Sequence, residues 1–221
     1  MMRFVRNNTT IPVPDVYGYH RDDTGTEYLF MSYIPGCTLE SVWKSMSSED
    51  RNEVIAQLKH YFDQLRSIPP PDPLLLGTPG SGIVNDTRRH NRQTHSITSE
   101  QQFNEFLGSF TFGRSRESTR VILLNLKDDH RIVLTHGDLH PRNIMVEGNK
   151  VTGIVDWAYG GWYPEYWEYI KGWNPVGRCQ DWWEHLRHVA GDYTFEWLVD
   201  YHLDELINNS PSKPQNPAVK N

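Results

Sequence analysis

The chain carries two carboxylates and one carboxamide at a spacing that suits the transfer of a phosphoryl group. Asp138 lies near the start of the string His-Gly-Asp-Leu-His-Pro-Arg-Asn, which ends at Asn143. Asp156 follows in the string Ile-Val-Asp-Trp, 18 positions after Asp138. Phosphoryl transfer needs one group that accepts the proton of the attacking hydroxyl, and hard oxygen ligands that hold magnesium on the nucleotide phosphates. These three side chains offer both.

Short strands around these residues are expected to bring them together. Residues 132–134 are apolar and predict a strand that leads into the first string. Residues 143–147 and 151–155 predict two further strands joined by a Gly-Asn turn. Because a hairpin returns the chain, we expect Asp156 to lie beside Asn143, so that the two side chains share a cation. The candidate functional side chains then lie on loops at the ends of a small group of strands, where rigid scaffolds often carry functional groups.

Elsewhere the pattern predicts little strand and a mainly helical chain. Residues 11–20 contain two prolines, which remove backbone donors, so we expect at most a short extended segment there. Residues 28–34 are rich in β-formers and predict a buried strand, ended by a Pro-Gly turn. Residues 69–98 predict a long loop. Helices are predicted from a cap at Thr38, from a cap at Ser47 to the prolines at 69–71, and over residues 99–107, 118–126, 163–172, 180–190 and 193–207.

The composition excludes several classes of protein. At 221 residues the chain suits one large domain or two small lobes. Its formal net charge is −6 and it has no basic run, so nucleic acid is a poor candidate partner. No stretch approaches the ~20 apolar residues of a membrane span, and the first residues lack the apolar core of a signal peptide. We therefore expect a cytoplasmic protein whose two cysteines, Cys37 and Cys179, are reduced thiols.

The two strings together resemble the aminoglycoside phosphotransferase and choline-kinase branch of the protein-kinase-like superfamily, especially its fungal members. Protein kinases carry His-Arg-Asp, an Asn five positions after that Asp, and a later Asp-Phe-Gly. Here Gly137 replaces the Arg and Trp157 follows the later Asp, which points to the phosphotransferase branch. The resemblance extends to residues 11–19 and 30–36, which look like the end of an N-lobe and the interlobe hinge. Residues 161–169 look like the segment after the metal-binding Asp.

The resemblance covers about residues 10–205 and implies an α+β, protein-kinase-like fold with a truncated small β N-lobe and a mainly helical C-lobe. Residues 1–36 would be a remnant of the N-lobe with the hinge, residues 37–207 the C-lobe, and residues 208–221 a disordered tail. The implied activity is that of a small-molecule kinase, which transfers the γ-phosphate of ATP, with Mg²⁺, to a hydroxyl of an unidentified acceptor. Aminoglycosides and choline carry positive charge, so the resemblance admits a cationic acceptor.

The resemblance also assigns roles to single residues of the two strings. Asp138 would be the catalytic base that orients the acceptor hydroxyl and takes its proton. His136 would brace the loop by hydrogen bonds. Asn143 and Asp156 would bind the magnesium ion. These four residues form the expected catalytic and metal site.

Nucleotide binding is the part in which the chain departs from the family pattern. By the resemblance, the Ser32 carbonyl and the Ile34 amide would meet the adenine edge, with Met31 lining the pocket behind it. The family also grips the phosphates with a covering loop, a strand Lys and a helix Glu. These would lie upstream of residue 10, where residues 1–10 leave no room for them. We therefore expect phosphoryl transfer that is impaired by the missing loop and lysine. The alternatives are a catalytically inactive, pseudokinase-like binding module or a truncated gene product.

The same departure has a consequence for residues 11–34. Without further strands their edge would lack partners, which predicts poor stability or association with another chain.

A different enzyme class also stays open, in which His136, Asp138 and His140 form a transition-metal site as in binuclear hydrolases. The remaining histidines form no second ligand motif, apart from the pair His185 and His188.

The C-terminal region carries an acidic stripe and most of the tryptophans. Glu196, Asp200 and Asp204 repeat every four residues, which places three carboxylates on one helix face. A solvated surface is the favoured interpretation, and a patch for a cationic acceptor is the alternative. Seven of the eight tryptophans lie at or after Trp157. Core packing is the favoured role for most of them, and an aromatic wall for a cation or a sugar is the alternative.

Overall fold

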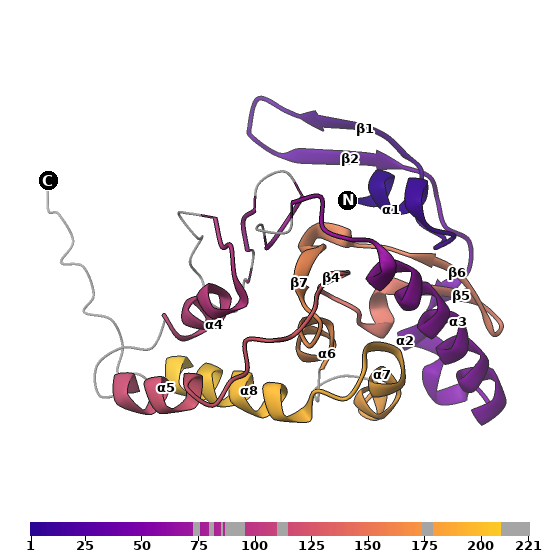
Figure 1. Cartoon of the computed structure of the whole chain (residues 1–221). Coiled ribbons are helices and arrows are strands. Elements are labelled where there is room, and N and C mark those ends of the chain that lie inside the picture. Colours follow the sequence, from indigo (N-terminus) through magenta and orange to yellow (C-terminus); the bar gives the residue numbers. More distant parts are fainter. Residues whose placement is uncertain are drawn as a thin grey trace, which may run out of the picture.

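The computed structural model shows a body of helices and short antiparallel sheets from which one β-hairpin projects (Figure 1). This confirms the mixed α and β composition that the sequence predicts. The structure describes residues 1–72, 76–79, 82–84, 86, 96–109, 115–173 and 179–208. The predicted tail beyond residue 208 and much of the predicted loop over 69–98 lie outside the described residues.

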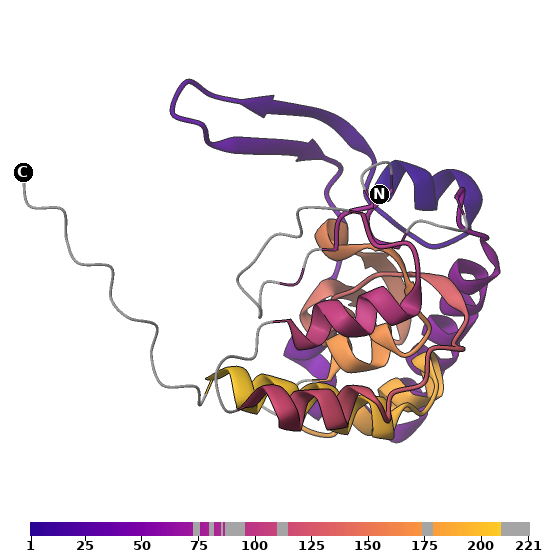
Figure 2. The ribbon, with the colours of Figure 1, turned by 60° about the vertical axis from the view of Figure 1, so that its left-hand side comes forward.

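The projecting hairpin consists of β1 (Val16–Arg21) and β2 (Glu27–Met31). Figure 2 shows it extending away from the body. Every residue of β2 is exposed, so the prediction of a buried strand over 28–34 is wrong. The physical reason is that β1 is the only strand paired with β2 among the described residues, and neither face of the pair is covered. The strand ends at Met31, although the Ser32 amide still donates a hydrogen bond to the Asp15 carbonyl at 2.8 Å.

Two small sheets inside the body frame the two strings of interest. One has the order β3 (Cys37–Thr38), β5 (Ile144–Glu147), β6 (Lys150–Ile154), and it confirms the predicted hairpin. The other pairs β4 (Ile132–Thr135), which was predicted, with β7 (Gly161–Pro164). The helix predicted over 163–172 therefore begins later, as α6 (Trp167–Gly172), because residues 161–164 extend to pair with β4.

Helices make up most of the remaining body. Side-chain caps confirm two predicted starts, since Ser47 Oγ accepts from the Asp50 amide and Ser99 Oγ from the Gln102 amide. The helix predicted over 118–126 is shifted toward the N-terminus, and the first helix was not predicted. The helices are α1 (Met2–Asn8), α2 (Leu39–Val42), the 3₁₀ turn η1 (Trp43–Ser45), α3 (Ser48–Ser67), α4 (Glu100–Gly108), α5 (Ser115–Leu123), α7 (Trp182–Ala190) and α8 (Thr194–Asn208).

The core lies around α3 and the short sheets. The buried side of α3 carries Leu58, Phe62 and Leu65, which pack in one cluster with strand residues of β4, β5 and β6. Most tryptophans are buried, which confirms core packing as their main role: Trp43, Trp157, Trp162, Trp167 and Trp182 are all 4 % exposed or less. Of the two cysteines, Cys37 is exposed and Cys179 is buried.

Two of the three carboxylates in the acidic stripe on α8 are buried, so the prediction of a solvated surface is wrong for them, while Asp204 is half-buried. Glu196 is 9 % exposed and Asp200 is 3 % exposed. Glu196 Oε1 lies 3.5 Å from His130 Nε2, and His130 Nδ1 lies 2.7 Å from Glu100 Oε1. The stripe therefore faces the body, because α8 packs on α4, α5 and α6 with these carboxylates turned inward.

None of the helices in the described part of the chain has the length and apolarity that crossing a membrane requires.

Candidate active site

The first string forms a buried loop that is anchored at both ends by β-structure. Residues 136–140 follow β4, and the 3₁₀ turn η3 (Pro141–Asn143) connects the loop to β5. The second string follows β6, and the turn η4 (Trp157–Tyr159) then leads into β7, which pairs back with β4. The sheets thus fix the entry and the exit of both strings.

Gly137 allows the loop to pass close to the second string. Its φ is +76°, in the left-handed region that favours glycine. A Cβ atom at this position would lie 2.5 Å from the Tyr159 carbonyl oxygen, which is too close for any side chain. This contact explains why the chain has glycine where protein kinases carry arginine.

A buried carboxylate that the sequence did not single out holds the start of the loop. Glu168, on α6, is fully buried, and its Oε2 accepts a hydrogen bond from the His136 amide at 2.6 Å. The Gly137 amide donates to Glu168 Oε1 at 3.2 Å. Burial raises the pKa of Glu168 to about 7, against the lowering effect of these amides. The signal in the sequence that could have pointed to Glu168 is that it is a single acidic residue between two aromatic residues, Trp167 and Tyr169.

His136 is neutral and has both ring nitrogens engaged. Its Nε2 lies 2.9 Å from the Val155 carbonyl, and its Nδ1 accepts from the Asp138 amide at 3.2 Å. This arrangement requires a proton on Nε2, which donates to the carbonyl. Complete burial lowers the pKa of His136 to about 4. The ring also packs against Trp157, with centroids 4.5 Å apart. His136 therefore ties the two strings together.

Asp138 presents its carboxylate to three donors of its own loop. Arg142 Nη2 lies 2.9 Å from both oxygens, His140 Nε2 lies 3.2 Å from Oδ1, and Asn143 Nδ2 lies 2.8 Å from Oδ2. Burial alone would raise the pKa of Asp138, but the hydrogen bonds and charges of His140 and Arg142, with the Asn143 amide, hold it below its usual range. The carboxylate is therefore ionised at neutral pH.

The structure brings Asn143 against Asp138 and links it to the second string. Asn143 Nδ2 also donates to the Asp138 carbonyl at 2.9 Å, so its Oδ1 is the oxygen left to face a cation. The Asn143 carbonyl accepts from the Val155 amide at 2.9 Å, which places Asp156 one residue beyond this contact. The hairpin therefore returns the chain to Asn143, as the sequence predicts.

Asp156 has a strained backbone and an exposed side chain. Its φ and ψ are both 61°, and it is the only residue other than glycine with a positive φ in the described ranges. Such conformations cost of order 1–3 kcal/mol and gather at functional sites. An exposed carboxylate held this way is open to a cation, and its charge acts on His136 across the loop.

The residues predicted to contact the adenine lie at the end of β2 and in the segment that follows it. Met31 is 44 % exposed at the end of β2, and Ser32 Oγ accepts from the Asp15 amide at 2.8 Å. Ile34 packs on β6, where a Cβ at Gly153 would lie 2.6 Å from Ile34 Cγ2. The segment thus connects to the strand that leads to Asp156, but no recorded contact joins Met31 or Ser32 to the two strings among the described residues.

The donor set fits magnesium and not a transition metal. Asn143 and Asp156 offer a carboxamide and a carboxylate oxygen, the hard ligands that magnesium prefers. Both nitrogens of His136 face protein partners, so His136 cannot serve as the ligand of a binuclear hydrolase site. In the described part of the chain, no group of three His, Cys, Asp or Glu side chains is placed to hold a metal ion.

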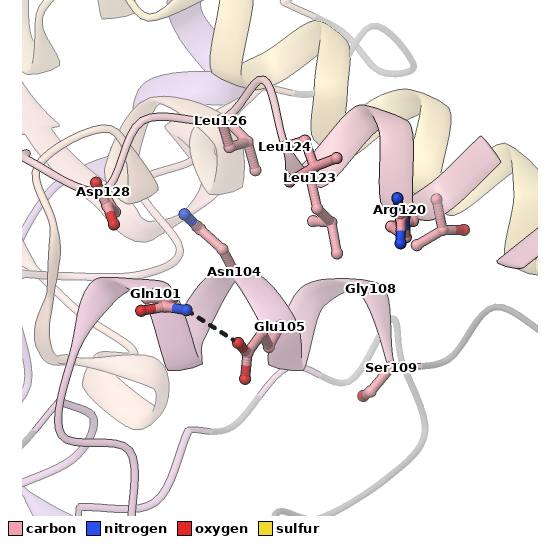
Figure 3. A pocket seen from close by; sticks show the side chains of 11 residues that line it. Gln101, Asn104, Glu105, Gly108, Ser109, Arg120, Leu123, Leu124, Leu126 and Asp128 are labelled. Carbon is pink, nitrogen blue, oxygen red and sulfur yellow. Dashed lines mark hydrogen bonds between the residues drawn. The ribbon is translucent and has the colours of Figure 1, made fainter. Parts of the chain in front are cut away.

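A separate cavity of about 740 Å³ lies between α4 and α5 (Figure 3). Its wall combines leucines such as Leu123 and Leu126 with polar side chains such as Glu105 and Asp128. None of residues 31–34 and 136–143 lines it. This cavity is therefore distinct from the site built by the two strings.

Comparisons with known proteins show which solved structures this fold resembles. A thermostable mutant of aminoglycoside phosphotransferase APH(4)-Ia, in ternary complex with ADP and hygromycin B, is similar in structure with a TM-score of 0.64 at 12% identity, over 93% of this chain and 73% of that one. The GDP complex of aminoglycoside 2'-phosphotransferase-IIIa matches with a TM-score of 0.55 at 13% identity, over 91% and 68% of the two chains. Aminoglycoside-3'-phosphotransferase of type VIII matches with 0.54 at 16% identity, over 94% and 76%.

These likenesses show the kinase-like fold of the aminoglycoside phosphotransferases, which the sequence predicts. No curated protein matches the chain. The phosphotransferase enzyme family matches residues 1–202, which is most of the sequence. This chain therefore belongs to the phosphotransferase enzyme family.

Proposed function

We propose that the chain is a small-molecule kinase that transfers the γ-phosphate of ATP to a hydroxyl of its acceptor. The observation that carries the proposal is the hydrogen bond of 2.8 Å from Asn143 Nδ2 to Asp138 Oδ2. The Asn143 carbonyl also accepts a hydrogen bond from the amide of Val155, the residue before Asp156. Family membership supports phosphoryl transfer, and the similar structures include complexes with ADP and with GDP.

In this proposal Asp138 accepts a hydrogen bond from the acceptor hydroxyl. As the bond from the acceptor oxygen to phosphorus forms and the bond to the nucleoside diphosphate breaks, the hydroxyl proton passes to the Asp138 carboxylate. A carboxylate whose pKa is held low is a weak base, so it serves mainly to orient the hydroxyl until the proton is released late in the reaction. His136 and Glu168 hold the loop in position for this step.

This chain's own residues would supply both the metal ligands and the groups that contact the adenine. Asn143 Oδ1 and the Asp156 carboxylate would hold Mg²⁺, which when bound neutralises charge on the phosphates. The Ser32 carbonyl and the Ile34 amide would meet the adenine edge, with Met31 behind it. In this proposal residues 1–36 form the N-lobe remnant and the hinge, and residues 37–207 form the C-lobe. The protein is cytoplasmic. Its acceptor is a small molecule, and neither nucleic acid nor a membrane is a partner.

A binding module without transfer is the second candidate, and one observation favours it. Arg142 holds both oxygens of the Asp138 carboxylate, so the proposed base is engaged inside its own loop. In this case the chain binds a nucleotide through the same loop and hinge and transfers nothing.

Turnover distinguishes the two candidates. The purified chain is incubated with ATP or GTP and Mg²⁺ and with a panel of aminoglycosides, choline and simple alcohols, while diphosphate release and product mass are measured. Acceptor-dependent turnover that falls about a thousandfold in Asp138→Asn supports the kinase. Nucleotide binding without transfer to any acceptor supports the binding module. Turnover that is unchanged in Asp138→Asn contradicts the proposed site.

A further inference from the structure

The guanidinium of an arginine in the same loop blocks access to the Asp138 carboxylate. Arg142 Nη2 lies 2.9 Å from each carboxylate oxygen. His140 Nε2 occupies Oδ1 as well, and Asn143 Nδ2 occupies Oδ2. Each oxygen therefore has two partners inside the loop. An acceptor hydroxyl can reach Asp138 only after one of these partners has moved.

Arg142 is the partner that is free to move. Its side chain is 46 % exposed, whereas the His140 side chain is 10 % exposed and Asn143 is buried. Both hydrogen bonds that the structure records for the Arg142 guanidinium go to Asp138. Because the Asp138 side chain is only 12 % exposed, opening the pair has a cost, which the new contacts of Arg142 with phosphate oxygens have to offset. His140 and Asn143 can stay in place and continue to position the carboxylate.

The phosphates of a nucleotide are the natural second partner for this guanidinium. The proposed reaction places a phosphoryl group next to the hydroxyl that Asp138 orients, and hence beside Arg142. Arg3 and Arg6 do not offer a ready alternative, since Arg3 donates to the Val16 carbonyl and Arg6 pairs with Asp15. A guanidinium binds phosphate oxygens with strong, charge-assisted hydrogen bonds.

We propose that Arg142 exchanges partners, holding Asp138 before the nucleotide binds and moving to the nucleotide phosphates afterwards. This inference rests on the proposed function, and it makes Arg142 a phosphate-binding residue. The exchange also sets an order, because the nucleotide draws Arg142 away before the acceptor hydroxyl can reach Asp138. The site thereby supplies a positive charge to the phosphates from within its own loop.

Calorimetry with two probes, MgATP and adenosine, tests the exchange on the full chain. We expect Arg142→Ala to weaken MgATP binding at least tenfold and to change adenosine binding less than twofold, while Arg142→Lys keeps part of the MgATP affinity. Arg131→Ala is the matched control, because it removes an exposed arginine paired with Glu165 outside the loop. It should change neither affinity. Thermal unfolding checks that every variant is folded.

A second readout follows the guanidinium itself. The side-chain ¹H–¹⁵N signal of Arg142, assigned by its loss in Arg142→Ala, should shift on addition of MgATP and stay unchanged with adenosine. Equal or tighter MgATP binding by Arg142→Ala would overturn the exchange and leave the proposed function standing. A wild-type chain that binds no MgATP at millimolar concentration would contradict the proposed function, and the role of Arg142 with it.

Discussion

Glu168 on α6 accepts a hydrogen bond of 2.6 Å from the His136 amide, and both residues are completely buried. This contact joins a helix of the body to the first residue of the loop that contains the proposed base, Asp138. Glu168 also accepts from the Gly137 amide, so one carboxylate serves two consecutive donors. Its charge state therefore bears on both the stability and the shape of the loop.

The buried Glu168 should make the fold less stable as the pH rises. Its pKa is about 7 in the folded chain against an ordinary value of 4.5, so the folded state binds more protons between these values. This stabilising contribution is complete below about pH 4.5 and is lost as the pH rises through about 7, at about 1.4 kcal/mol per unit of pKa difference. Urea unfolding at pH 5 and pH 8 should show a smaller pH effect in Glu168→Gln than in wild type. The same pH effect in both proteins would contradict this.

Gly137 should be intolerant of a side chain for two separable reasons. Gly137→Ala adds a strained positive φ and a contact of 2.5 Å with the Tyr159 carbonyl oxygen. Gly148→Ala, in the β5–β6 turn, adds only the strain, because its φ is +60° and nothing lies within 4 Å of the new Cβ. We expect about 1 kcal/mol of destabilisation for Gly148→Ala and at least about 3 kcal/mol for Gly137→Ala in chemical denaturation. Equal losses would show that the Tyr159 contact is unimportant.

The β1–β2 hairpin should promote association between chains. Tyr19 and Leu29 face each other across the strands, and they are 60 % and 47 % exposed. Exposed apolar strands with open edges are common sites of aggregation. Sedimentation over a range of concentrations should show association that decreases in the double variant Tyr19→Thr, Leu29→Thr. Leu124→Thr removes a leucine of 72 % exposure on the segment after α5 and is the control. An equal decrease in this control would argue against the hairpin.

The sequence predicted the elements whose signals are local. The cap at Ser47, the apolar spacing of α3 and the Gly-Asn turn between β5 and β6 depend on nearby residues, and the structure confirms them. The contact of Asn143 with Asp138 and its link to Val155 also agree with the expected return of the hairpin.

The errors arose where distant partners decide the structure. Residues 161–164 extend because β4 offers a partner, and nothing in their own sequence shows this. Apolar residues 28–31 indicated burial, but no second layer covers them among the described residues. The carboxylates of Glu168, Glu196 and Asp200 lie inside the body because of how α6 and α8 pack, which helical periodicity alone does not reveal.

A manganese titration is the most direct test of the site, because Mn²⁺ replaces Mg²⁺ and is visible by electron paramagnetic resonance. With ATP present, the wild-type chain should bind one Mn²⁺. Asp156→Ala should weaken that binding at least tenfold, and Glu147→Ala, which removes an exposed carboxylate at the far end of the same hairpin, should leave it unchanged. Manganese binding by Asp156→Ala as tight as that of the wild type would contradict the placement of the cation between Asn143 and Asp156.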